Sequence, residues 1–310
     1  MKTNTIIQTD ALKGFKSIPD EIVDCIITSP PYWALRDYGV EGQLGLEPTF
    51  DEYIKKLCDI FEEGKRVLKK SGTCWVNIGD TYSATRWTNN ENSGQPINKF
   101  RDGYRGINPK KITNLEDKSL CNIPARFSIE MQNRGWILRN VIIWYKNNCM
   151  PSSAKDRFTV DFEYMFFFVK NKKYFFETQY EPVKPETIQR NKYGWDGEKK
   201  TGAYSVKRDA GSFMSEQGRI KRTVWNINTK PFKEAHFAVF PEELVETPIK
   251  AGCPENGVVL DPFIGSGTTG LVALKQNKKF IGFEINPEYI KIANKRLKPF
   301  LEQKKLFEVV

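Results

Sequence analysis

The chain has 310 residues, a formal net charge of +10, six cysteines and a single histidine. One histidine argues against a zinc site and a Ser-His-Asp triad, and the absence of a C-x-x-C pair is typical of reduced thiols. The N-terminus does not resemble a signal peptide, and no apolar run reaches the roughly 18 residues of a membrane span. We therefore expect a soluble cytoplasmic protein, monomeric or homodimeric, without a membrane partner, whose charge favours a polyanionic partner.

Two short strands open the chain, and the second runs into a rigid corner. Residues 5–8 predict the first strand, and Asp10 then precedes a short helical pattern in the position of an N-cap. The apolar run 22–27 predicts a buried strand. It stops at Thr28-Ser29-Pro30-Pro31-Tyr32-Trp33, where two prolines fix φ and end the hydrogen-bond ladder.

This corner combines acceptors with aromatic faces. Ser29 brings a hydroxyl, the residues before the prolines bring carbonyls, and Tyr32 and Trp33 bring flat rings. Such a set suits a planar ring that carries an exocyclic amino group. A plain Pro-Pro turn with core aromatics is the alternative.

Helices and strands alternate through the middle of the chain. A capping box at Thr49–Glu52 predicts the start of a helix that ends at Ser71-Gly72. Periodicity then predicts a strand over 73–80, a helix over 120–132, a strand over 136–144, and an antiparallel hairpin of 162–169 with 174–176.

Two segments carry an excess of basic residues. The connection 83–117 is either a solvated loop or one that orders on a phosphate backbone. Residues 183–233 hold twelve Lys and Arg against five Asp and Glu, interleaved with aromatic residues. A concentrated basic segment with aromatics is typical of nucleic-acid binding, although a charge run is often only a solvated face.

A glycine-rich loop follows near the C-terminus. After a helix predicted over 242–250, a strand ends at Asp261-Pro262-Phe263 and leads into Gly265-Ser266-Gly267-Thr268-Thr269-Gly270 before another helical pattern. This is G-x-G-x-x-G with a strand before it and a helix after it. Glu284 ends the next predicted strand, about 20 residues past the first glycine, where an acid binds ribose hydroxyls. A final helix is predicted from Pro287.

Together, the Ser29 corner and the glycine loop resemble the DNA amino-methyltransferases, which methylate cytosine N4 or adenine N6. Their order, S-P-P-Y first and glycine loop last, matches the β group of that family. The resemblance implies a Rossmann-like, circularly permuted α/β fold that uses S-adenosylmethionine on double-stranded DNA. It divides the chain into a catalytic half over 1–182, a target-recognition region over 183–233 and a cofactor half over 234–310.

The resemblance assigns roles to individual residues. The catalytic set is Ser29, Pro30, Pro31 and Tyr32, with Tyr32 stacked on a flipped base. The cofactor set is Asp10, Asp261, Pro262, Phe263, Gly265, Gly267, Thr268, Thr269 and Glu284. The expected DNA contacts are Lys199, Lys200, Lys207 and Arg208. The loop with Lys146, Asn147, Pro151 and Ser152 is expected to border the base, with Arg157 nearby. His236 is expected to be positional.

The S-P-P-Y form favours cytosine N4 over adenine N6, because D-P-P-Y goes mostly with adenine in this family. Cytosine C5 methylation needs a Pro-Cys nucleophile, and the chain has no Pro-Cys pair. A restriction endonuclease that acts on the same sequence is the expected functional partner. The rival hypotheses are a nicotinamide-dependent dehydrogenase, which also uses a glycine loop, and a non-catalytic DNA-binding regulator.

Overall fold

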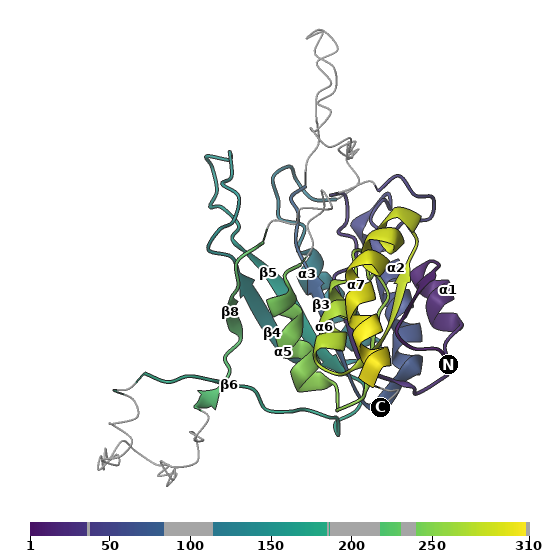
Figure 1. Ribbon diagram of the computed structural model, residues 1–310. Helices are drawn as coiled ribbons and strands as arrows, with labels where there is room; N and C mark the ends of the chain where they lie inside the picture. The colour runs from purple at the N-terminus through teal and green to yellow at the C-terminus, as the bar shows by residue number, and fades with distance from the viewer. Residues whose placement is uncertain (36–37, 84–113, 185, 187–217, 231–239, 308–310) are drawn as a thin grey trace. The chain divides into compact units, whose positions relative to one another are not determined.

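The computed structural model describes two compact units. The described residues are 1–35, 38–83, 114–184, 186, 218–230 and 240–307 (Figure 1). Unit 1 comprises Met1–Phe176 and Val224–Val310, and unit 2 comprises Glu177–Thr223. In the described part of unit 2, β6 (Tyr180–Glu181) pairs antiparallel with β7 (Arg219–Ile220). The boundaries at 183 and 233 stay a prediction.

Unit 1 is built on an eight-stranded sheet with the order β1-β10-β9-β2-β3-β5-β4-β8. Among the described strands of this sheet, only β5 runs antiparallel to its neighbours. The strands are β1 (Thr5–Gln8), β2 (Val23–Thr28), β3 (Leu68–Ile78), β4 (Ile137–Tyr145), β5 (Phe162–Val169), β8 (Val224–Asn226), β9 (Val258–Asp261) and β10 (Lys279–Glu284). The strands predicted over 22–27 and 136–144, and the predicted strand that ends at Glu284, are thus confirmed within one residue.

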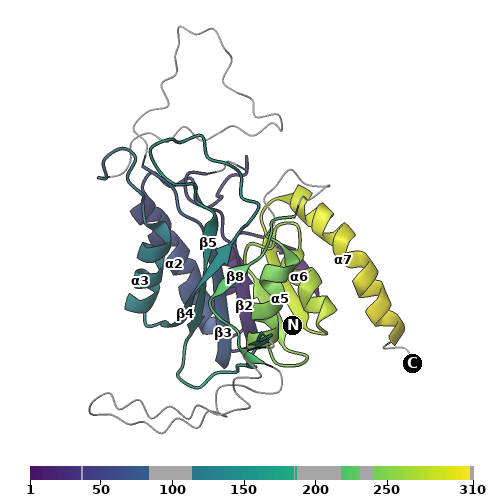
Figure 2. The same ribbon diagram turned by 90° about the vertical axis from the view of Figure 1, so that its left-hand side faces the viewer.

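Helices cover both faces of the sheet (Figure 2). One face carries α1 (Ala11–Lys16), α2 (Phe50–Val67) and α3 (Ile123–Asn133), and the other carries α5 (Glu242–Gly252), α6 (Thr268–Lys275) and α7 (Pro287–Phe307). Each face has its own buried cluster: one contains Phe15, Phe61 and Phe127, and the other contains Leu244, Val272 and Leu297. A mostly parallel sheet between two helical layers confirms the predicted α/β class. Among the described helices, none has the length and apolarity needed to cross a membrane.

Side-chain caps fix where two helices begin. The Asp10 carboxylate accepts a hydrogen bond from the Lys13 backbone N–H at 2.9 Å. The Thr49 hydroxyl accepts one from the Glu52 backbone N–H at 3.1 Å. Both predicted N-caps are confirmed, because these bonds satisfy amide groups that have no partner within the helix.

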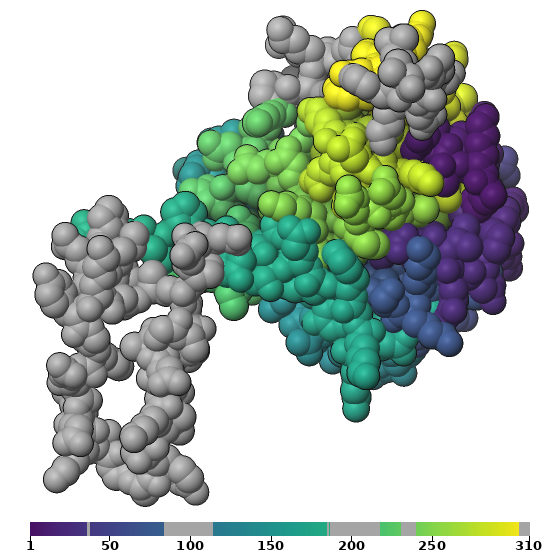
Figure 3. Space-filling view, turned by 60° about the horizontal axis from the view of Figure 1, so that its bottom comes forward, coloured from purple at the N-terminus to yellow at the C-terminus, as the bar shows by residue number. Residues whose placement is uncertain are grey.

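The sheet brings the two ends of the sequence together. β1 pairs in parallel with β10, and β10 pairs with β9. Figure 3 shows the corresponding contact between the N-terminal residues, in purple, and the C-terminal part of unit 1, in yellow. After β9, the next strand, β10, lies on the side of β9 away from β2. After β2, the next strand, β3, lies on the side of β2 away from β9. The neighbours β9 and β2 therefore mark a topological switch point, where ligands of open α/β sheets bind at the carboxyl ends of the strands.

Two sequence predictions about the middle of the chain are wrong, and the first concerns a helix end. The helix predicted from the Thr49 capping box ends at Val67 and not at Ser71-Gly72, because β3 starts at Leu68 and runs through Gly72. A side chain at Gly72 would lie 2.6 Å from the Leu68 side chain, so packing inside the strand explains this glycine.

The second is the hairpin of 162–169 with 174–176, which does not form. β3 and β4 already occupy both hydrogen-bonding edges of β5. Tyr174 and Phe176 instead contact Phe167 through their rings, with centroids 5.8 and 5.7 Å apart. The residue pattern indicated the strand itself correctly, but it did not identify the strand's partners.

Candidate active site

The corner after β2 is held from behind by the core. The Pro31 carbonyl accepts a hydrogen bond from the Tyr53 hydroxyl at 2.9 Å, and Pro30 is buried. Trp33 is 6 % exposed and packs edge-on against Phe50, with ring centroids 5.8 Å apart. Trp33 is therefore a core residue, and the expectation that its flat face borders the acceptors is wrong.

Ser29 and Tyr32 meet a polar cluster that the sequence did not reveal. The Ser29 hydroxyl lies 3.4 Å from the Tyr32 hydroxyl, which donates to the Glu163 carboxylate at 2.5 Å. Asn77 Nδ2 also donates to Glu163, at 3.1 Å, and Lys146 Nζ lies 2.7 Å from its other oxygen. Burial and the neighbouring Glu163 charge raise the pKa of Tyr32 well above its usual value, so the phenol keeps its proton. A lone acid at the start of the aromatic strand β5 was the available signal for Glu163.

Asp261 organises the turn after β9. Its carboxylate accepts hydrogen bonds from the Phe263 backbone N–H at 3.0 Å and from the Thr269 hydroxyl at 2.6 Å, and Pro262 joins the strand to the loop. Burial raises the pKa of Asp261 to about 6, against the effect of these hydrogen bonds. The buried Thr28 hydroxyl lies near the carboxylate without meeting full hydrogen-bond geometry.

Two glycines let the loop turn into α6. Gly265 and Gly267 have φ values of +49° and +86°, in the left-handed region that favours glycine. A side chain at Gly267 would lie 3.0 Å from Ala293 Cβ, whereas one at Gly265 would meet, among the described residues, only the Phe263 carbonyl, at 3.9 Å. No other described residue fills the space in front of Gly265, and α6 starts shortly after it, at Thr268.

Arg296 of α7 fixes the same loop and was not predicted from the sequence. Its Nη1 donates to the Ser266 carbonyl at 2.7 Å, to the Ser266 hydroxyl at 3.0 Å and to the Thr268 hydroxyl at 3.2 Å. An arginine that binds three oxygens of one turn restrains its backbone more firmly than a single contact does. A basic residue in the following helix is too common a feature to have indicated this role.

Glu284 and Asp10 lie at the ends of neighbouring strands. Glu284 is 9 % exposed and accepts hydrogen bonds from the Gly265 N–H at 3.0 Å and the Asn286 N–H at 2.8 Å. Burial raises the pKa of its carboxyl group. Asp10 caps α1 two residues after Gln8, which pairs with Glu284 across β1 and β10.

These groups suit a ligand that carries ribose hydroxyls and approaches the glycine loop. An ionised carboxylate has about four lone-pair sites, so the two hydrogen bonds to Glu284 leave acceptor capacity for ribose hydroxyls. The open space at Gly265 admits a ligand to the loop backbone at the start of α6, where the helix dipole favours negative charge. The acceptors, the open loop and the adjacent Ser29 corner all lie at the carboxyl ends of β1, β10, β9 and β2.

Some predicted residues lie outside the described residues, and others contact neighbouring side chains. The four proposed DNA contacts and the single histidine are outside them: Lys199, Lys200, Lys207, Arg208 and His236. In the loop after β4, Arg157 stacks over the Tyr82 ring at 3.9 Å, and Asn147 Nδ2 donates to Asn226 Oδ1 at 2.7 Å. Asp80, at the end of the strand predicted over 73–80, accepts the backbone N–H groups of Thr81 at 2.9 Å and Ile123 at 3.0 Å, so it stabilises the turn that follows β3.

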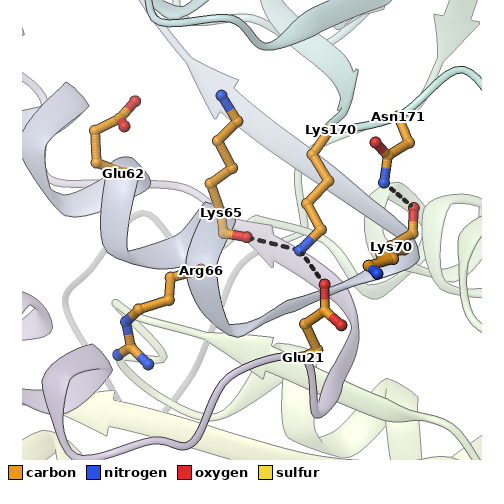
Figure 4. Close-up of a pocket in the computed structure, with 7 residues that line it drawn as sticks. All are labelled: Glu21, Glu62, Lys65, Arg66, Lys70, Lys170 and Asn171. Atoms are coloured by element: carbon orange, nitrogen blue, oxygen red, sulfur yellow. Dashed lines mark hydrogen bonds and ion pairs between the residues drawn. The ribbon is translucent and has the colours of Figure 1, made fainter.

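A charged hollow lies at the opposite end of the strands (Figure 4). It lies by the end of α2, the start of β3 and the residues after β5, and it is lined by Glu21, Glu62, Lys65, Arg66, Lys70, Lys170 and Asn171. Lys170 Nζ donates to the Lys65 carbonyl at 3.1 Å and to Glu21 at 3.3 Å. Arg66 pairs with Asp20 and Glu63. These charges hold α2 against the sheet, so we assign the hollow a structural role.

Comparison with known proteins agrees with this geometry. The family model for N6/N4 DNA methylases matches residues 23–295. Type II methyltransferase M.Cfr9I from Citrobacter freundii is 41% identical over 293 residues, covering 94% of this chain and 87% of the relative. Type II methyltransferase M.SmaI from Serratia marcescens is 39% identical over 301 residues, covering 96% and 91%.

Solved structures share the fold at lower sequence identity. The PvuII DNA methyltransferase, described as cytosine-N4-specific, superimposes with a TM-score of 0.64 at 20% identity, covering 96% of this chain and 86% of that one. TTHA0409 from Thermus thermophilus, complexed with S-adenosyl-L-methionine, gives a TM-score of 0.57 at 22% identity, covering 95% of both chains. These matches confirm the Rossmann-like methyltransferase fold, and the family model together with the close relatives shows that the chain belongs to the N6/N4 DNA methylases.

Proposed function

We propose that the protein transfers a methyl group from S-adenosylmethionine to the exocyclic N4 amino group of cytosine in double-stranded DNA. The observation that carries this proposal is the position of Ser29 at the end of β2, beside the Asp261 loop of β9. A serine in S-P-P-Y, where adenine enzymes of the family mostly have aspartate, supports cytosine. The described specificity of the PvuII enzyme, a structural relative, supports it as well.

The methyl transfer needs little general acid or base catalysis. Bound S-adenosylmethionine supplies an activated sulfonium methyl, so the transfer depends mainly on positioning. The lone pair of an exocyclic amine is delocalised into its ring. Acceptors on its two N–H bonds, for which we propose the Ser29 hydroxyl and the Pro30 carbonyl, localise that pair and stabilise the charge that develops on nitrogen.

The residues of the neighbouring strands hold the donor. Glu284 would accept hydrogen bonds from the ribose hydroxyls, Asp10 would face the adenine, and the loop from Asp261 to Thr269 would hold the methionine part. Asp261 acts through the loop, because its carboxylate already binds the Phe263 N–H and the Thr269 hydroxyl. Pro262, Gly267 and Thr268 shape that loop.

The proposed DNA binding depends on the basic segment and on access of the target base to the Ser29 corner. The target base must leave the duplex, because its amino group is otherwise inaccessible, and Tyr32 then lies beside it. The segment 183–233 is the proposed target-recognition region, with Lys199, Lys200, Lys207 and Arg208 on phosphates. Since two close relatives are type II methyltransferases, we infer that the enzyme acts in the cytoplasm, alongside a restriction endonuclease with the same recognition sequence.

Adenine N6 is the second candidate, because the family contains both specificities. Membership of this enzyme family sets aside the dehydrogenase and the non-catalytic regulator. The deciding experiment incubates DNA with the protein and tritiated S-adenosylmethionine, and then separates the nucleosides. We expect the label in N4-methylcytosine. Label in N6-methyladenine would replace the cytosine assignment, and unlabelled DNA from every substrate sequence tried, including random-sequence DNA, would contradict the activity.

A further inference from the structure

A chain of four polar side chains connects Ser29 to a lysine behind the corner. The Ser29 hydroxyl lies 3.4 Å from the Tyr32 hydroxyl, and the Tyr32 hydroxyl lies 2.5 Å from Glu163 Oε2. Glu163 Oε1 completes the chain with Lys146 Nζ at 2.7 Å. The members come from the corner after β2, the start of β5 and the residue after β4, so the sheet register aligns them.

The neighbours of Glu163 fix it as an acceptor. Lys146 carries only donors, and it also lies 4.8 Å from the centre of the Trp144 ring, which holds its ammonium in place. Asn77 Nδ2 lies 3.1 Å from both Glu163 Oε2 and the Tyr164 carbonyl. Because both contacts are acceptors, the Asn77 amide must turn its nitrogen toward them. Glu163 is therefore surrounded by donors, as an ionised carboxylate requires.

This arrangement decides where the Tyr32 proton points. A phenol has one proton, and Glu163 offers a charged oxygen at 2.5 Å whereas Asn77 Oδ1 offers a neutral one at 3.1 Å. The proton therefore points at Glu163. Tyr32 can then only accept from Ser29, so the Ser29 proton points inward and its lone pairs remain for a group outside the corner.

We propose that Glu163 is a positioning residue that sets the direction of this hydrogen-bond chain and so presents the Ser29 hydroxyl to the target amino group as an acceptor. The proposal rests on the role of Ser29 in the proposed function. A Ser29 hydroxyl turned the other way would point its proton at an amine that becomes positive during transfer. Glu163 prevents this orientation without touching the DNA base or the methyl donor.

The first test is Glu163→Gln, because a glutamine amide can donate to Tyr32 and reverse the chain. In single-turnover methylation, we expect the rate to fall by about tenfold or more, as when a preorganised partner in an active site is lost. Affinity for S-adenosylmethionine and for DNA should stay native. Glu130→Gln, which removes a carboxylate from another ion pair, with Arg134, is the matched control and should keep the native rate.

A double-mutant cycle separates positioning from general damage to the fold. If Glu163 acts through Ser29, Glu163→Gln should slow the wild type but not a Ser29→Ala enzyme further. Tyr32→Phe keeps the ring but breaks the hydrogen-bond chain, so it should also slow the wild type and not slow Ser29→Ala further. This variant replaces Glu163→Gln in the cycle if Glu163→Gln does not fold. Equal slowing in both backgrounds would overturn the proposal. If Glu163→Gln keeps the native rate while Ser29→Ala is impaired, the Glu163 proposal is overturned and the proposed role of Ser29 stands. If Ser29→Ala keeps the native rate, the role of Ser29 is rejected, and the Glu163 proposal falls with it.

Discussion

Ile26 of β2 stands opposite Leu260 of β9 in the parallel register of the sheet. Two residues further along, β2 ends at Thr28 and leads into Ser29, and one residue past Leu260 β9 ends at Asp261. Parallel neighbours that end together place their following loops side by side. This one pairing therefore brings the S-P-P-Y corner to the glycine loop, although about 230 residues of chain separate them.

The two left-handed glycines of the loop should respond differently to a methyl group. Gly267→Ala adds backbone strain and a contact 3.0 Å from Ala293, so we expect a loss of about 2–3 kcal/mol in unfolding free energy. Gly265→Ala adds its methyl to open space and should cost only about 1 kcal/mol. Urea unfolding measures both.

Gly265→Ala, the milder change for stability, should be the more damaging one for cofactor binding. Its added methyl occupies the space that we assign to S-adenosylmethionine, so calorimetry should show clearly weaker binding in a protein that remains folded. Native affinity in Gly265→Ala would show that the donor does not approach the loop there.

Glu284→Gln should weaken S-adenosylmethionine binding by about 1–3 kcal/mol, because ribose hydroxyls lose a charged partner. For an analogue of S-adenosylmethionine without the ribose 2′-hydroxyl, the difference in affinity between the wild type and Glu284→Gln should be much smaller. Glu288→Gln is the control, since Glu288 is an exposed acid that pairs with Lys291. An equal loss for both ligands would mean that Glu284 acts only by holding the Gly265 N–H.

Asp261 should make stability fall as pH rises. Its folded pKa of about 6 lies above the ordinary value of 3.8, so the folded state binds the proton more tightly than the unfolded state. The associated stability is present below pH 4 and is lost as pH rises through 6, amounting to about 2–3 kcal/mol. Asp261→Asn cannot titrate. Between pH 4 and pH 7 the wild type should therefore lose stability relative to Asp261→Asn in urea unfolding, and parallel profiles would argue against a raised pKa.

The basic segment should determine the salt dependence of DNA binding. Each phosphate contact that is removed lowers the slope of log K against log salt by about 0.9. Neutralising four residues to glutamine should therefore flatten the slope measured by fluorescence anisotropy. The four residues are Lys199, Lys200, Lys207 and Arg208.

A control variant neutralises four exposed lysines of unit 1 and should leave the slope nearly unchanged. These residues are Lys16, Lys55, Lys172 and Lys250. Equal flattening in both variants would indicate that only net charge matters and that the segment makes no specific contact with the DNA backbone.

Local patterns made the framework predictable. Short apolar runs indicated the strands before Ser29 and Glu284, and Asp10 and Thr49 marked helix starts that the structure confirms. These signals work because strand burial and helix capping depend on residues a few positions apart. The glycine loop was recognisable for the same reason.

Contacts between distant segments were not predictable. The Tyr32–Glu163 hydrogen bond joins residues 131 positions apart, and it depends on β5 inserting antiparallel between β3 and β4. Nothing in the aromatic run 162–169 states which strands will flank it, which also explains the failed hairpin. The burial of Trp33 against Phe50 likewise depends on where α2 packs.

Single-turnover methylation by Ser29→Ala, with saturating DNA and S-adenosylmethionine, tests the central claim most directly. Removing the hydroxyl takes away one acceptor whose contact strengthens as the target nitrogen becomes positive, while the prolines and Tyr32 still shape the corner. We expect the methyl-transfer rate to fall by about 10²-fold, with affinity for S-adenosylmethionine and DNA unchanged. Methyl transfer at the native rate would show that Ser29 does not activate the amine, and it would remove the main support for cytosine N4.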